Sequence, residues 1–230
     1  GCFLLGACGD ALGAPLEGLR DLKVIKEHYG DSGLSEIIEF KNAYGSGIDY
    51  PPGRITDDTT MAMTTAAAML LTPLMPKEGL ADRLRPLLWQ GYLNWCVHQD
   101  DGALLRSKID TSIQWPDLAK DFWFACGAGR GTIAALSQEK PGSVAAPLTY
   151  DCVVRGKKTT GPNAGCGGMM RVAPLAFLEG VSPAERFEIA CENAAVTHGD
   201  PAAYVATGIV ALYIHFAARD MNMYDTMAKT

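Results

Sequence analysis

Residues 182–219, SPAERFEIACENAAVTHGDPAAYVATGIVALYIHFAAR, decide the fold because they contain two helix-start signals in succession. The first, Ser182-Pro183-Ala184-Glu185, is a capping box with proline in the first turn. The second, Asp200-Pro201, follows a glycine of the kind that ends helices. The stretch therefore predicts two consecutive helices, over residues 182–198 and 200–219.

Helical patterns also occupy much of the remaining chain. They predict helices over residues 2–13, 59–71, 79–98 and 131–138. Residues 30–56, rich in Gly, Asp, Tyr and Pro, are typical of an ordered loop, and the aromatic-rich segment 100–125 is also loop-like. The longest alternating strand pattern runs only from Leu148 to Val154. The sequence therefore predicts an all-α fold in a compact single domain.

Composition excludes several functional classes. The 230 residues, 48% of them hydrophobic, are enough for a sizeable core. With a net charge of −6 and no basic run longer than Lys157-Lys158, a nucleic-acid partner is not indicated. The apolar stretch from Ala202 to Ala218 is too short and too polar for a membrane span. Seven cysteines without a C-x-x-C pair favour a reducing compartment, so we expect a cytoplasmic protein.

Thr56-Asp57-Asp58 stands directly before the helix predicted over residues 59–71. At a helix start, two carboxylates and a hydroxyl could face one pocket, and such hard oxygen ligands suit Mg²⁺, Mn²⁺ or Ca²⁺ rather than zinc. The same residue types are also favoured helix caps, and acidic residues in a first turn complement the helix dipole. The triplet alone leaves both interpretations open.

Three further features have a functional and a purely structural interpretation. The glycine-rich loop 127–132 could place backbone N–H groups and Arg130 around a phosphate, or be a flexible turn. His198, before a glycine, is typical of a cationic cap at a helix C-terminus. Cys166 has no accompanying His or Asp signature, so we expect a small buried side chain rather than a nucleophile.

Four segments of the chain occur in a characteristic order. They are Gly9-Asp10-Ala11-Leu12-Gly13-Ala14-Pro15-Leu16-Glu17, Thr56-Asp57-Asp58-Thr59, Gly165-Cys166-Gly167-Gly168-Met169-Met170-Arg171-Val172-Ala173-Pro174 and Thr197-His198. Together they resemble the ADP-ribosylglycohydrolase family, whose members share a G-D-A-x-G-x-P-x-E start, a T-D-D-T cluster, a G-x-M-R-x-A-P segment and a T-H pair. The resemblance spans nearly the whole chain and implies an all-α domain over residues 1–230.

This resemblance implies a metal-dependent hydrolase that cleaves the glycosidic bond at the ribose anomeric carbon of an ADP-ribosylated protein or small ADP-ribose conjugate. It further implies a cofactor of Mg²⁺ or Mn²⁺, as two ions, with Thr56, Asp57 and Asp58 as metal ligands. Glu17 would gate the site or assist the attacking water, so that Glu17, Asp57 and Asp58 form the catalytic set. The implied substrate-binding residues are Asn163, Gly165, Cys166, Gly167, Gly168, His198, Gly129 and Arg130.

The sequence departs from the family pattern in two places. Gly165-Cys166-Gly167 stands where several members have Gly-Asn-Gly. The D-x-D-T segment that completes the family's metal site is not matched by Asp220 or by Asp225-Thr226, so we expect the chain to lack the C-terminal end of the domain. One alternative is therefore a catalytically weak member that binds ADP-ribose or has a structural role. Another is a phosphate-ester hydrolase that uses the same ions.

Overall fold

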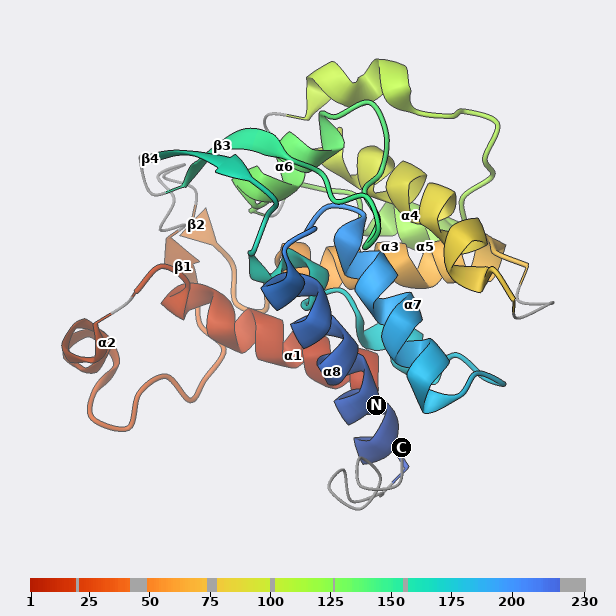
Figure 1. Ribbon diagram of the computed structural model, residues 1–230. Coiled ribbons are helices and arrows are strands. Elements are labelled where there is room, and N and C mark those ends of the chain that lie inside the picture. Colours follow the sequence, from red (N-terminus) through yellow and green to blue (C-terminus); the bar gives the residue numbers. More distant parts are fainter. Residues whose placement is uncertain are drawn as a thin grey trace. The chain divides into compact units, whose positions relative to one another are not determined.

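The computed structural model describes residues 1–19, 21–41, 49–73, 78–99, 102–125, 127–154 and 157–219. Helices dominate these residues, and the described strands pair into two antiparallel two-stranded sheets (Figure 1). The predicted all-α architecture is therefore confirmed. The chain forms two compact units, Gly1–Thr59 and Thr60–Thr230, and one domain over residues 1–230 stays a prediction.

The first unit contains two helices, a short hairpin and the start of a third helix. Its elements are α1 (Cys2–Gly13), the 3-10 helix η1 (Ala14–Leu16), α2 (Leu22–Tyr29), β1 (Phe40–Lys41), β2 (Asp49–Tyr50) and the first residues of α3 (Asp57–Leu71). Helix α1 confirms the prediction over residues 2–13. Helix α2 was not predicted; the Asp21 side chain caps its start by accepting a hydrogen bond from Lys23 N, and Gly30, with φ 81°, ends it.

The second unit is built mainly from longer helices. Its elements are the rest of α3, α4 (Leu80–Cys96), η2 (Ala103–Lys108), α5 (Asp117–Asp121), α6 (Arg130–Leu136), β3 (Tyr150–Val154), β4 (Lys157–Gly161), η3 (Cys166–Gly168), η4 (Ala173–Phe177), α7 (Pro183–Ala195) and α8 (Pro201–Ala217). All predicted helices of this unit are present. Segment 100–125, expected to be loop-like, instead contains η2 and α5, and β4 was not predicted because Lys-Lys-Thr-Thr-Gly lacks an apolar alternation.

Helices α7 and α8 pack against each other, as Figure 1 shows. The predicted capping box is present, because Glu185 N donates to Ser182 Oγ (3.2 Å) and Ser182 N donates to Glu185 Oε2 (2.7 Å). Gly208 allows the close approach of the two helices, since a Cβ there would lie 2.5 Å from the ring of Phe187. The two start signals thus fix where the helices begin, and Gly208 allows their close spacing.

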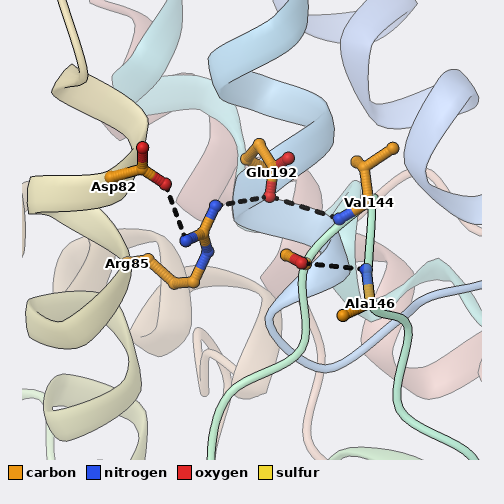
Figure 2. A network of polar contacts seen from close by, with 6 residues as sticks. Asp82, Arg85, Val144, Ala146 and Glu192 are labelled. Atoms are coloured by element: carbon orange, nitrogen blue, oxygen red, sulfur yellow. Dashed lines mark hydrogen bonds and ion pairs between the residues drawn. The ribbon is translucent and has the colours of Figure 1, made fainter.

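An ion pair joins α4 to α7 (Figure 2). Arg85 on α4 donates to Asp82 Oδ1 (2.8 Å) and to Glu192 Oε2 on α7 (2.9 Å), and Glu192 also accepts from Val144 N (3.3 Å). About a fifth of the Arg85 and Glu192 side chains is exposed, so we expect this pair to contribute on the order of 1 kcal/mol or less. Its main effect is to place the loop before β3 beside α7.

Aromatic side chains fix the rotation of α3 within the second unit. Three buried threonine hydroxyls of α3 pair with aromatic polar atoms, as Thr60–Trp95 (2.9 Å), Thr64–Trp123 (3.2 Å) and Thr65–Tyr92 (2.7 Å). Because buried indole and phenol groups need hydrogen-bond partners, these pairs favour one orientation of the helix about its axis. They explain why an apolar helix of the core carries so many threonines.

Candidate functional site

Asp10, on α1, binds the start of α3 through four hydrogen bonds. Its Oδ1 accepts from Thr56 Oγ1 (2.8 Å). Its Oδ2 accepts from the backbone N–H groups of Thr56 (2.8 Å) and Thr59 (3.2 Å) and from Thr59 Oγ1 (2.6 Å). The first N–H groups of a helix have no partner within the helix, and here a carboxylate 46 residues away supplies one. Asp10 belongs to the Gly9–Glu17 motif, but no role was predicted for it from the sequence.

The triplet Thr56-Asp57-Asp58 lies at the N-terminus of α3, as predicted. Asp58 N donates to Thr56 Oγ1 (3.3 Å), so Thr56 acts as a helix cap. Asp58 Oδ2 lies 3.3 Å from the same hydroxyl. Asp57 is buried, with 7% of its surface exposed, whereas Asp58 is exposed. The capping interpretation thus holds for Thr56, and the role of all three residues as metal ligands stays a prediction.

Negative charge accumulates around Asp58. Dense surrounding protein disfavours its charged form although the residue reaches the surface, and with the charges of Asp10 and Glu17 this raises the pKa of Asp58 to about 6. Glu17 is exposed and directly follows η1. A divalent cation with oxygen ligands would relieve this repulsion. In the described parts of the chain, no three Asp, Glu, His or Cys side chains are arranged to hold a metal by themselves. The carboxylates and the Thr56 hydroxyl therefore fit Mg²⁺ or Mn²⁺ as part of a larger ligand set.

In the second unit, Asn163 and His198 meet the turn of residues Gly165–Gly168, hereafter the glycine turn. Asn163 Oδ1 accepts from Gly165 N (2.9 Å). A Cβ on Gly167 would lie 2.7 Å from Cε1 and Nε2 of His198, and one on Gly165 would lie 3.6 Å from Nε2. The structure therefore brings four of the predicted substrate-binding residues together. Their substrate-binding role stays a prediction.

The remaining predicted substrate-binding residues lie around this turn or in the loop before α6. Gly129 and Arg130 are exposed at the start of α6. Next to them, Gly131 belongs to the glycine-rich segment 127–132 but was not predicted to bind substrate; a Cβ there would clash with the side-chain amide of Asn163, so the first turn of α6 reaches the residues beside the glycine turn. Cys166 is exposed, so the expectation of a buried cysteine was wrong. It precedes Gly167 and Gly168, the two buried glycines of this turn.

Gly168 packs against α7, and its replacement by alanine should destabilise the fold. A Cβ there would lie 2.6 Å from the Cβ and 2.9 Å from the Cα of Ala194. Overpacking of this kind costs about 1 to 3 kcal/mol, which chemical denaturation will measure as a lower free energy of unfolding. Gly129→Ala is the matched control, because its nearest neighbour would be 3.7 Å away. Equal stabilities of the two variants would contradict the close packing at Gly168.

A buried arginine stands behind His198. Arg171 is fully buried and its Nη2 donates to Asn193 O (3.0 Å) and Thr197 Oγ1 (2.8 Å). Its guanidinium carbon lies 4.0 Å from the centroid of the Tyr92 ring, a cation–π contact. Thr197 Oγ1 in turn lies 2.7 Å from His198 Nδ1. One continuous chain of polar contacts therefore runs from the core to the glycine turn.

His198 is neutral at physiological pH. Burial, and secondarily the charge of Arg171, lower the pKa of His198 to about 3. Helix α7 ends at Ala195, three residues before His198. The interpretation of His198 as a cationic helix cap was therefore wrong, because an imidazolium would be desolvated next to another buried cation. An uncharged imidazole remains, suited to hydrogen bonding.

Two further expectations concerned the family's D-x-D-T segment and a membrane-spanning helix. Asp220 and Asp225-Thr226, the residues compared with the family's D-x-D-T segment, lie outside the described residues. Of the helices in the described ranges, none combines the length and the apolar character needed to cross a bilayer.

The sequence was compared with protein families, with known proteins and with solved structures. The family model described as ADP-ribosylglycohydrolase matches residues 1–230. A protein of Archaeoglobus fulgidus, described as uncharacterized, is 38% identical over 85 residues, which are 36% of this chain and 25% of that protein. The match thus spans a quarter of the relative's length. No solved structure matches the chain significantly.

Proposed function

Because the chain belongs to the ADP-ribosylglycohydrolase family, we propose that it is a divalent-metal-dependent hydrolase of the bond between ADP-ribose and a protein side chain or small conjugate. The observation that carries the proposal is the acidic start of α3, where desolvation and then the charges of Asp10 and Glu17 raise the pKa of Asp58 to about 6. Groups with such perturbed pKa values are concentrated at functional sites. We expect the protein to act in the cytoplasm on substrates that carry ADP-ribose.

In this proposal Thr56, Asp57 and Asp58 supply ligands for Mg²⁺ or Mn²⁺. Such ions would supply Lewis acidity and orient a water and the ribose hydroxyls. The residues of the chain account for the remaining requirements. Glycosidic cleavage develops positive charge on the ribose ring, which nearby carboxylates stabilise. The exposed Glu17 carboxylate would accept a proton from the attacking water.

The glycine turn is proposed to bind the ADP-ribose part of the substrate. Glycines leave the backbone open to close approach by a ligand. The Asn163 amide and the neutral ring of His198 add uncharged polar groups, and ribose hydroxyls and diphosphate oxygens are suitable partners for such groups. In this proposal the glycine turn gives specificity for ADP-ribose.

A second candidate is a catalytically weak member of the family that binds ADP-ribose. The observation that favours it is an incomplete set of metal ligands. The described residues contain no group of three Asp, Glu, His or Cys side chains that could hold an ion. On this alternative the protein would bind ADP-ribose through the glycine turn without turning over conjugates.

The release of free ADP-ribose distinguishes the two candidates. The protein would be incubated with proteins ADP-ribosylated on arginine or on serine, with Mg²⁺ or Mn²⁺, and the released ADP-ribose quantified by liquid chromatography. We expect release with one of the two substrates and its loss on addition of EDTA. Binding of ADP-ribose by calorimetry without release, at saturating metal, would instead support the second candidate. Hydrolysis of simple phosphate esters alone would reject both.

A further inference from the structure

We propose that Arg171 and Thr197 position His198 so that its ring carries one proton, on Nε2, and offers this N–H to an acceptor oxygen of a ligand at the glycine turn. Arg171 and Thr197 act through His198 and are positioning residues. Only the identity of the ligand, ADP-ribose, rests on the proposed function; the placement of the proton rests on the hydrogen bonds alone.

The Arg171–Thr197 hydrogen bond can have only one direction. A guanidinium group only donates, so Thr197 Oγ1 must accept from Arg171 Nη2 at 2.8 Å. The hydroxyl hydrogen of Thr197 is then left for a different acceptor. Because Thr197 has no exposed surface, water does not supply that acceptor and the protein must.

His198 Nδ1 is the acceptor for the Thr197 hydroxyl hydrogen. His198 Nδ1 lies 2.7 Å from Thr197 Oγ1, and no other hydrogen bond of this hydroxyl reaches a described residue except the one from Arg171. Nδ1 must therefore be unprotonated, and the single proton of the neutral ring sits on Nε2. With the proton on Nδ1 instead, the buried Thr197 hydrogen would have no acceptor, which is the costly case for a buried donor.

The His198 Nε2 atom points toward the glycine turn. It lies 2.7 Å from the position that a Cβ on Gly167 would take, and Thr132 Oγ1 lies 3.3 Å from the same position. His198 Nε2 makes no hydrogen bond to a described residue and is not one of the fully enclosed atoms without a partner. The N–H thus faces the glycine turn at a place that any side chain on residue 167 would fill.

The His198 ring lies near a positive charge. Arg171 is the charged group nearest to His198 in the network, and an aromatic ring, that of Tyr92, covers its guanidinium group. From β3, the Tyr150 hydroxyl donates to Thr197 O (3.1 Å). The surroundings of the ring therefore oppose a second proton, and His198 is a hydrogen-bond donor rather than a general base or a cation.

The test begins with the ring itself. Long-range ¹H–¹⁵N spectra of the His198 ring should show a neutral ring protonated at Nε2 at pH 7. Thr197→Ser keeps the hydroxyl and should keep this spectrum. Thr197→Val keeps the shape but removes the hydroxyl, and should convert the signal to a mixture of the two neutral forms. Because a merely structural role of Thr197 would not move the proton between nitrogens, this readout isolates positioning.

Affinity for ADP-ribose, measured by calorimetry in the presence of Mg²⁺, gives the second readout. Thr197→Val should weaken binding about tenfold, and Thr197→Ser should stay within about threefold of the native chain. A native ring protonated at Nδ1, or a Thr197→Val chain with the native spectrum and affinity, would overturn the inference. A ring protonated at Nε2 in a chain that does not bind ADP-ribose would support the positioning and reject the proposed ligand.

Discussion

Replacing Asp58 with asparagine should lower the rate of ADP-ribose release about 1000-fold without loss of stability, because the side chain keeps its shape but loses the charge that a divalent cation needs. In the folded chain the pKa of Asp58 is raised to about 6, by desolvation from the dense surrounding protein and by the charges of Asp10 and Glu17. Its ionisation therefore lowers the stability as the pH rises from 3.8 to about 6. At pH 7 the neutral amide removes that unfavourable term, so the temperature of unfolding should stay the same or rise.

The combination of lost activity with retained or increased stability is the signature of a residue kept for function. Asp31→Asn is the matched control in the same unit, because Asp31 carries an exposed carboxylate that faces Lys26 at 3.4 Å. This control should change neither the rate nor the temperature of unfolding. An Asp58→Asn chain that releases ADP-ribose at more than about a tenth of the native rate would contradict the role of Asp58 as a metal ligand.

Local signals explain which parts of the fold could be predicted. The capping box of Ser182 and Glu185 is complete within four residues, and the Asp200 cap within three, so sequence spacing contains the whole interaction. The start of α3 at the Thr56-Asp57-Asp58 triplet was predictable for the same reason. Helix α2 had a cap and a terminal glycine, but its eight residues contain too short a pattern to indicate a helix.

The contacts that build the site are not local, which explains why sequence reasoning missed them. Asp10 and Thr56 are 46 residues apart, and Arg171 and Thr197 are 26 apart. The family resemblance places these residues in shared motifs without indicating which motif binds which. The same holds for Gly131, whose proximity to Asn163 depends on where the first turn of α6 packs. The tertiary contacts of Asp10, rather than its spacing in the sequence, identify it as a cap for the start of α3.

Asp10→Asn should destabilise the chain by about 2 to 3 kcal/mol, in contrast to the same chemical change at Asp58. Both oxygens of Asp10 accept hydrogen bonds from donors of Thr56 and Thr59, so an amide in either orientation turns an NH₂ group toward at least one donor. The temperature of unfolding should fall by roughly 5 to 10 °C, measured by circular dichroism.

A double-mutant cycle with Thr59→Val assigns this loss to the helix cap. Thr59 Oγ1 donates the shortest of the four bonds to Asp10, at 2.6 Å. In the native chain Thr59→Val should cost about 1 to 2 kcal/mol, and much less once Asp10 is asparagine, because the partner is already impaired. Strictly additive losses would mean that the two side chains act independently. In that case the loss on Asp10→Asn would have to come from its other hydrogen bonds, those from Thr56 and from the backbone N–H of Thr59.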